Sequence, residues 1–167
     1  MIKQIERTYL EINFLKDLKE PKDRLKFISI DLVNPPDFQL NKFFYKNVGK
    51  NHHWIDRLIW EDKQWAEYTS SENLKTYVLK KNGDLAGFFE LLFHHEKNEV
   101  EIAYLGLLED YHNQKLGSYL LSTAIKNSFL GNPKRVWVHT CSLDHKNALN
   151  NYLSRGMKIF KKESVKI

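Results

Sequence analysis

Residues 100–130 read VEIAYLGLLEDYHNQKLGSYLLSTAIKNSFL, and this stretch decides the fold class. Segment 100–108 is rich in aliphatic and β-branched residues and predicts a strand. A polar loop, 109–115, follows it. Apolar residues then recur at helical spacing, which predicts an amphipathic helix over 116–130: Leu116, Leu120, Leu121, Ala124, Ile125 and Phe129. We therefore expect a strand that runs through a short loop directly into a helix.

Upstream of this unit the hydrophobic period changes to two. Segments 76–79 and 85–92 flank Asn82-Gly83, a strong two-residue hairpin signal. A second connection, 95–98, leads into strand 100–108. These three strands form an antiparallel meander.

The remaining elements extend the sheet and cover it. Further strands are expected at 5–13, 26–33, 135–140 and 157–162, and further helices at 38–49, 60–68 and 146–154. No repeat or flexible linker divides the 167 residues, so we expect one domain over 1–167. The predicted fold class is an α/β sandwich with a mixed, mostly antiparallel sheet flanked by about four helices.

The composition narrows the kind of protein. Hydrophobic residues make up 42% and charged residues 28%, which fits a globular chain rather than a disordered one. The single cysteine, Cys141, excludes an intramolecular disulfide framework and a multi-cysteine zinc site. There is no apolar run of the ~18–20 residues that a membrane span needs, and no signal-peptide core. These features predict a cytoplasmic protein with no membrane partner.

Charge is uneven along the chain. Residues 133–167 carry 8 basic and 2 acidic side chains, whereas residues 51–132 carry 8 basic and 12 acidic ones. A basic tail could attract a polyanion such as nucleic acid. However, only 5 of the 26 basic residues are arginine, the residue favoured for bidentate phosphate and base recognition. A lysine-rich solvated surface is the preferred interpretation, and no nucleic-acid partner is expected.

The loop 109–115 is a candidate anion site. A strand that feeds a helix N-terminus presents free backbone N–H groups at the positive end of the helix dipole, which suits a phosphate. An ordinary strand-to-helix turn remains the alternative.

This region resembles the GNAT superfamily of acyl-CoA-dependent N-acyltransferases, whose pyrophosphate loop has the form Arg/Gln-x-x-Gly-x-Gly/Ala. The motif aligns to His112-Asn113-Gln114-Lys115-Leu116-Gly117, followed by Ser118. His112 stands where Arg or Gln is usual, and Lys115 replaces the first Gly. A second register beginning at Gln114 would place the bulky Tyr119 at a small-residue position, so the first register is preferred.

The flanking segments agree with the family. Its pattern of Asn, Ala three residues later, Tyr four after that and a closing Gly-Phe pair falls on His145, Ala148, Tyr152 and Gly156-Met157. Residues 51–160 match best, and strings within them are similar to a bacterial acetyltransferase subgroup. The family fold has one more strand than can be placed after Phe160. Either the chain stops early or segment 5–13 supplies the missing pairing.

The resemblance implies transfer of an acetyl or other acyl group from acetyl-CoA to a primary amine, by direct attack in a ternary complex. A lysine-like amine has a pKa of about 10.4 and must lose a proton before it attacks. Tyr152 matches the general acid that protonates the leaving thiolate, and Glu101 lies on the strand that carries the base in several members. The structural alternatives are a core tyrosine and a solvated strand glutamate.

The resemblance also implies binding residues. It places acetyl-CoA against Leu107, Leu108, His112, Asn113, Gln114, Lys115, Leu116, Gly117, Ser118, His145 and Ala148. It places the acceptor near Trp54, Asp56, Glu90 and His139. An Asp56-Arg57 ion pair and a core role for Trp54 are the structural alternatives. No cluster has the spacing of metal ligands, so no metal is expected.

Two other functions remain open. One is a non-catalytic domain of the same fold that binds an acyl-CoA or a protein partner, and the other is a basic nucleic-acid-binding module. The sequence leaves open whether the acceptor is a small-molecule or a protein amine, and whether the chain is a monomer or a homodimer.

Overall fold

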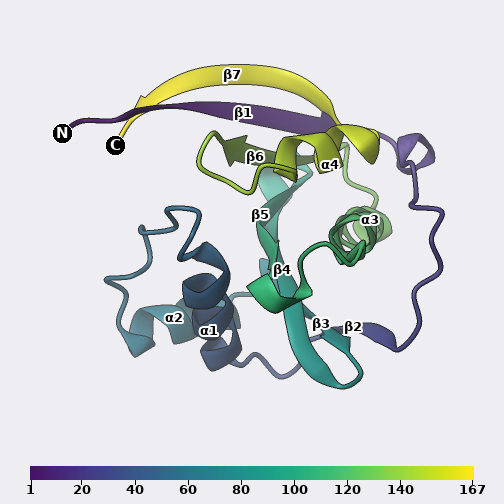
Figure 1. Ribbon diagram of the computed structural model, residues 1–167, viewed down its shortest axis with the longest axis horizontal. Helices are drawn as coiled ribbons and strands as arrows, with labels where there is room; N and C mark the ends of the chain where they lie inside the picture. Colours follow the sequence, from purple (N-terminus) through teal and green to yellow (C-terminus); the bar gives the residue numbers. More distant parts are fainter.

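A seven-stranded sheet forms the centre of the computed structural model, which describes all 167 residues. The strand order is β2-β3-β4-β5-β6-β1-β7, and every neighbouring pair is antiparallel except β5 and β6 (Figure 1). The strands are β1 (Gln4–Ile12), β2 (Ile28–Leu32), β3 (Leu74–Lys81), β4 (Asp84–His94), β5 (Glu99–Leu107), β6 (Arg135–Cys141) and β7 (Lys158–Lys166). The helices are α1 (Phe38–Gly49), α2 (Asp62–Ser70), α3 (Leu116–Ser128) and α4 (Ala148–Ser154). The predicted fold class, a mostly antiparallel sheet with four helices, is confirmed.

The first strand of the chain completes the sheet at its far edge. β1 lies between β6 and β7, and its Arg7 is paired in register with Cys141 on one side and Glu163 on the other. β7 also runs to Lys166, beyond the expected end at 162. Of the two alternatives for the missing pairing, the structure shows the one in which the N-terminal segment supplies it.

Some helix ends differ from the expected ones by two residues. α2 begins at Asp62 because a capping box precedes it. The Glu61 side chain accepts from the backbone N–H of Gln64, and the Gln64 side chain accepts from the backbone N–H of Glu61. α4 begins at Ala148. α3 ends at Ser128 and continues as a single 3-10 turn. None of the helices has the length and apolarity that a membrane crossing requires.

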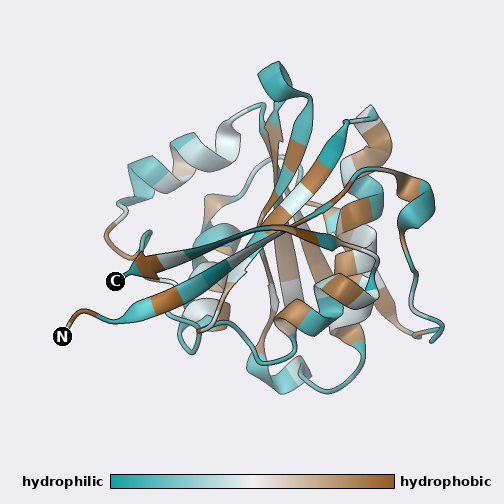
Figure 2. Cartoon of the chain, turned by 90° about the horizontal axis from the view of Figure 1, so that it is seen from above, coloured by the Kyte–Doolittle hydropathy of each residue, from teal (hydrophilic) through white to brown (hydrophobic).

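The two faces of the sheet are covered by different helices. α3 packs on one face and forms the main core with residues such as Leu91, Val100 and Ile102. α1 packs on the other face, where Phe44 stacks on Phe88 at 5.0 Å. Figure 2 shows apolar residues concentrated in the middle of the sheet and hydrophilic residues in the outer loops. Because these helices cover the two faces of the sheet, the ends of the middle strands are free to form a site.

The sheet splits between its two parallel strands. β5 and β6 are paired only where Glu99–Glu101 faces Arg135–Trp137, and the strands then diverge. On its other edge β5 carries a bulge, because Glu90 pairs with Tyr104 while Leu91 pairs with Ile102, which leaves Ala103 as the extra residue. The split opens a wedge toward the C-terminal ends of both strands.

Gly156 fixes the chain reversal after α4, and a side chain there is expected to destabilise the fold. Its φ is +99°, and a Cβ would lie 2.2 Å from the backbone oxygen of Asp17. We expect Gly156→Ala to lower the free energy of unfolding by about 2–3 kcal/mol in urea denaturation. Gly83→Ala is the matched control, since Gly83 has φ +83° but open space around it, so only about 1 kcal/mol should be lost. Equal losses would contradict the close contact with Asp17.

Candidate active site

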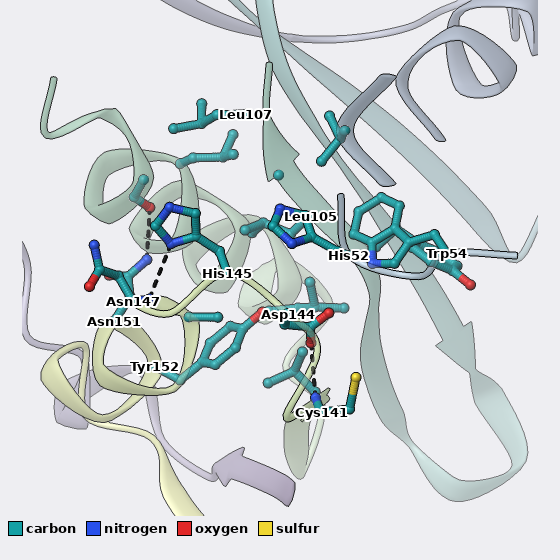
Figure 3. A pocket seen from close by; sticks show the side chains of 18 of the residues that line it. His52, Trp54, Leu105, Leu107, Cys141, Asp144, His145, Asn147, Asn151 and Tyr152 are labelled. Carbon is teal, nitrogen blue, oxygen red and sulfur yellow. Dashed lines mark hydrogen bonds between the residues drawn. The ribbon is translucent and has the colours of Figure 1, made fainter. Parts of the chain in front are cut away.

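The wedge between β5 and β6 holds a cavity of about 500 Å³. Its walls come from β5, the loop before α3, the first turn of α3, β6, α4 and the loop after α1 (Figure 3). Most of the residues predicted from the sequence line it: Trp54, Asp56, Leu107, His112, Asn113, Lys115, Leu116, Gly117, Ser118, His139, His145, Ala148 and Tyr152. Segments far apart in the sequence therefore meet at one site.

The loop before α3 presents unused backbone donors to this cavity. Asn113 and Lys115 have φ values of +61° and +65°, which turn successive N–H groups toward a common side. None of the backbone hydrogen bonds outside helices and strands has its donor in 113–118. These N–H groups also lie at the positive end of the α3 dipole. The loop therefore has the features of a phosphate-binding site.

Lys115 adopts the left-handed backbone conformation in which a glycine is comfortable. Its ammonium group is exposed and lies 3.3 Å from Asp23 Oδ1. Such an exposed pair contributes little to stability, whereas the left-handed conformation costs a residue with a Cβ about 1–2 kcal/mol.

Lys115→Gly is therefore expected to raise the free energy of unfolding by about 0.5–1 kcal/mol, once the entropy of glycine is subtracted. Chemical denaturation measures this change. Lys115→Ala removes the same charge but keeps the Cβ, and should give no gain. If both variants changed stability equally, strain at this position would not be the cause.

Three histidines meet across the cavity. The His145 ring lies 5.0 Å from the His112 ring and 6.0 Å from the His52 ring, measured between centroids. His112 Nε2 is also 3.1 Å from the Leu107 carbonyl oxygen, which ties the loop to the end of β5. Burial, followed by the charges of His112 and His52, lowers the pKa of His145. His145 is consequently neutral at neutral pH.

Tyr152 lies in the interior of the site. Its side chain is 7% exposed, and Figure 3 shows its ring reaching toward Asp144. Burial, followed by the negative charge of Asp144, raises the pKa of the Tyr152 hydroxyl above its ordinary value. The hydroxyl therefore keeps its proton and can serve as a donor.

Asp144 is held by the turn that follows β6. Its carboxylate accepts hydrogen bonds from the backbone N–H of Cys141, at 2.9 Å, and from the Thr140 hydroxyl. Burial, followed by the Asp144 charge, raises the pKa of the Cys141 thiol. A protonated thiol is a poor nucleophile, so the geometry does not favour nucleophilic catalysis by Cys141. No group of three or more His, Cys, Asp or Glu side chains is arranged to hold a metal ion.

The other end of the cavity has aromatic walls. Trp54 packs edge-on against Tyr104 at 4.8 Å and also against Phe88, so it is both a core anchor and a lining residue. His139 lies 5.4 Å from the Tyr9 ring. Desolvation by the surrounding protein, followed by the charge of Arg7, lowers the pKa of His139. This end can receive a polar group beside a neutral imidazole.

Glu90 lies behind that wall rather than in it. It is fully buried and accepts hydrogen bonds from Arg57 at 3.1 and 3.3 Å, from Tyr68 at 2.7 Å and from Asn41 at 2.9 Å. The Asp56-Arg57 pair, the structural alternative for these residues, is not formed, because Arg57 turns inward to Glu90 while Asp56 stays exposed. The structure thus separates Glu90 from the cavity.

An aromatic cage surrounds the Arg57 guanidinium. Its central carbon lies within 4.2–5.6 Å of the ring centroids of Tyr45, Trp60, Trp65, Tyr68 and Tyr104. Such contacts stabilise a desolvated cation. The cage fastens the loop after α1, and with it Trp54, onto the sheet.

Glu101 lies beside the cavity but does not line it. Its carboxylate is 3.0 Å from His94 Nε2, and its side chain is 16% exposed. The Ala103 bulge puts Tyr104 on the same face of the sheet as Glu101 despite their odd spacing. Two other predicted residues, Leu108 and Gln114, also do not line the cavity, and the Gln114 amide donates to the Asp110 carbonyl at 3.1 Å.

Sequence reasoning missed several lining residues on α4 and nearby. The Asn151 amide donates to the Gly117 carbonyl at 3.1 Å and so joins α4 to the first turn of α3. Arg155, the residue that follows the end of α4, also lines the cavity. Only helical spacing could have indicated these residues in the sequence, since Ala148, Asn151, Tyr152 and Arg155 share one helix face.

Comparison with known proteins points to one family. A family model described as "Acetyltransferase (GNAT) family" matches residues 38–157. A search of the curated proteins finds no match.

Solved structures share the fold at low sequence identity. A GCN5-related N-acetyltransferase from Kribbella flavida is 14% identical with a TM-score of 0.68, and the match covers 99% of this chain and 58% of that one. One from Sphaerobacter thermophilus is 13% identical with a TM-score of 0.73, covering 97% of this chain and 51% of that one. An aminoglycoside acetyltransferase from an uncultured soil metagenomic sample is 15% identical with a TM-score of 0.64, covering 77% and 87%. The chain thus spans little more than half the length of the first two, and these similarities concern the fold.

Proposed function

The chain belongs to the GNAT family of acetyltransferases, and from this we propose that it transfers an acetyl group from acetyl-CoA to a primary amine. The observation that carries the proposal is the cavity in the β5–β6 wedge. Free N–H groups of a helix N-terminus lie along it, and a protonated tyrosine lies within it. Transfer of an acyl group from a nucleotide-linked thioester can use both features.

The cavity suits the two chemically different parts of acetyl-CoA. The N–H groups of 113–118 offer donors to the diphosphate. Beyond Glu101, β5 has lost its β6 partner, so one edge of its backbone is available to the amides of the pantetheine arm. Leu107 and Leu116 add apolar surface beside that edge. One elongated ligand can therefore use both the loop and the strand.

Tyr152 is the proposed general acid. The amine nitrogen attacks the thioester carbonyl carbon, the C–S bond breaks, and the sulfur leaves as a thiolate that takes up a proton. The Tyr152 hydroxyl is protonated at neutral pH, as a tyrosine ordinarily is, and burial and Asp144 raise its pKa further. Its place on the wall of the cavity lets it donate that proton to a sulfur bound there.

We propose that His139 takes the proton of the amine and that Glu101, the residue expected to be the base, contributes only by stabilising the imidazolium that forms. The Glu101 carboxylate does not reach the cavity, whereas the His139 ring lines it. The two groups are close enough for the Glu101 charge to affect the pKa of His139. His139 has a lowered pKa and is therefore neutral at neutral pH, so it can accept the proton of the amine.

Glu101→Gln tests this arrangement. We expect kcat/KM at neutral pH to fall by about 10²-fold. His139 becomes protonated only below its lowered pKa, so the wild-type rate should fall as pH drops through that value, and His139→Gln should remove this limb. Glu99→Gln is the matched control, because Glu99 is on the same strand face but pairs with Arg135 at 3.1 Å. An unchanged rate and pH–rate profile in Glu101→Gln would exclude a role for Glu101 in base catalysis.

Release of free thiol from acetyl-CoA tests the reaction itself. The amine panel would contain aminoglycosides, polyamines, amino acids and lysine peptides, with aminoglycosides first because one structural neighbour is an aminoglycoside acetyltransferase. The proposal expects amine-dependent thiol release together with an acetylated amine detected by mass spectrometry. Binding of acetyl-CoA without turnover of any amine would instead support the non-catalytic alternative.

A further inference from the structure

Arg7 brings a positive charge to the cavity from the first strand of the chain. It lies on β1, which is inserted between β6 and β7, and it lines the cavity. Only one other arginine lines the cavity, Arg155, which follows the end of α4. The Arg7 side chain is 32% exposed, so a ligand can reach it.

Strand alternation fixes the face of the sheet on which Arg7 lies. Leu10 of β1 and Val138 of β6 belong to the core beneath α3. Arg7 and His139 lie an odd number of residues from these positions, so both point to the opposite face. That face is the one on which α1 and Trp54 pack. Arg7 therefore shares a face with the proposed base and with the Trp54 wall of the cavity.

Arg7 and His139 are also close neighbours across the two strands. Arg7 pairs with Cys141, and His139 lies two residues before Cys141, so Arg7 and His139 are diagonal neighbours about 7–8 Å apart. In agreement with this, the charge of Arg7 contributes more than any other charge to the pKa of His139. A ligand whose amine lies at His139 is consequently within reach of the guanidinium.

The ion pair with Glu163 leaves much of the guanidinium free. Arg7 Nη1 lies 3.3 Å from Glu163 Oε1, and neither Nε nor Nη2 makes a hydrogen bond to the protein. Glu163 is also shared, because it accepts from the Tyr9 hydroxyl at 2.6 Å and lies 3.5 Å from Lys161 Nζ. The planar fork of a guanidinium matches the two oxygens of a carboxylate. Arg7 thus has donors left for the carboxylate of a ligand.

The cavity also offers a negative charge for the other end of such a ligand. Asp56, on the loop after α1, lines the cavity and is exposed. The second carboxylate of the wall, Asp144, already accepts two hydrogen bonds from β6. Asp56 can attract an ammonium group, His139 can take its proton, and Arg7 can hold a carboxylate. We infer that Arg7 determines the acceptor specificity by binding a carboxylate, so that the acceptor is an amino acid, an inference that rests on the proposed function.

Pairs of amines that differ only in a carboxylate test this specificity. The pairs are phenylalanine with phenethylamine, leucine with isoamylamine, and lysine with cadaverine. Thiol release from acetyl-CoA gives the ratio of kcat/KM within each pair. The ratio is used because loss of the Arg7 charge also changes the pKa of His139, which affects both members of a pair. In at least one pair, we expect the wild type to prefer the amino acid by about 10- to 100-fold.

Four variants separate carboxylate binding from a structural role. Arg7→Met, which keeps an apolar stem, should abolish the preference, and Arg7→Lys, which loses the fork, should keep part of it. Glu163→Gln is the matched control, since it breaks the ion pair but keeps the guanidinium, and it should retain the preference. Lys161→Met removes a neighbouring cation that does not line the cavity, and should retain it too. The Tm of Arg7→Met should stay within a few degrees of the wild type, because an exposed ion pair contributes little.

A wild type without the preference, or an Arg7→Met variant that keeps it, would overturn the inference while leaving the proposed function intact. Loss of the preference in Glu163→Gln as well as in Arg7→Met would also overturn it, by showing that the ion pair shapes the site. Acetylation only of amines that lack a carboxylate would have the same consequence. If the folded chain acetylated no amine of these pairs or of the wider panel, the proposed function would fail, and the inference with it.

Discussion

Tyr152→Phe is expected to lower kcat by about 10²- to 10⁴-fold, with little change in the KM for acetyl-CoA. The substitution removes only the hydroxyl that we propose as the proton donor to the leaving thiolate. The ring stays in place, so the 7% exposed side chain should pack as before. Steady-state thiol release measures the effect once an acceptor amine is known.

Two controls make the Tyr152 result interpretable. Tyr119→Phe removes a hydroxyl from a partly buried tyrosine of α3 that does not line the cavity, and should leave kcat unchanged. Thermal unfolding of Tyr152→Phe should match the wild type to within a few degrees. If kcat were unchanged, Tyr152 would be a core tyrosine and another group would protonate the thiolate.

Arg57→Met is expected to lower the free energy of unfolding by about 3–5 kcal/mol, the range for removing one member of a buried ion pair. The Glu90 carboxylate would remain fully buried, with only Tyr68 and Asn41 as donors. The aromatic cage around Arg57 would lose its cation as well. Urea denaturation measures the loss.

The double variant Arg57→Met/Glu90→Leu isolates the unpaired charge. Removing both charges should recover much of the stability lost in Arg57→Met, since no buried charge is then left alone. The exposed Lys42–Asp62 pair gives a matched comparison, and Lys42→Met should change stability by less than about 0.5 kcal/mol. A double variant no more stable than Arg57→Met would show that the lost contacts of the guanidinium, rather than the unpaired Glu90 charge, account for the loss.

The Arg57 cluster also has a consequence for activity. It fastens the loop that carries Trp54 and Asp56, which line the cavity and which we propose lie beside the acceptor amine. A conservative change such as Arg57→Lys should therefore raise the KM for the amine more than the KM for acetyl-CoA.

Local patterns were enough to predict the part of the fold that holds the loop. The meander of β3, β4 and β5 follows from period-two segments around Asn82-Gly83, and α3 follows from apolar residues at helical spacing. These elements depend on contacts between residues close in the sequence. The predicted phosphate loop accordingly lies where the strand-to-helix transition placed it.

Non-local pairing was harder to predict. β1 and β7 are joined by pairs such as Arg7 with Glu163, and the segment KIFKKESVK of β7 is too rich in lysine to show a clear alternation. The sequence therefore left open how the sheet ends. Only the three-dimensional pairing shows that β1 lies between β6 and β7.

The predicted site residues show the same difference between local patterns and non-local contacts. Those on the loop, apart from Gln114, and those on α4 line the cavity because helical spacing and the strand end fix their positions. Glu90 and Glu101 do not line it, because Glu90 pairs with the buried Arg57 and Glu101 interacts with His94. Neither interaction can be read from strand alternation. The Ala103 bulge further breaks the simple rule of alternating faces.

The most direct test of the account is a calorimetric titration of the folded protein with acetyl-CoA, using CoA and ADP as controls at two salt concentrations. We expect micromolar binding that needs the pantetheine arm, so that CoA and acetyl-CoA bind much more tightly than ADP. We also expect weaker binding at high salt, because phosphate contacts contribute. No binding of any of the three would contradict the assignment of the β5–β6 cavity as an acetyl-CoA site.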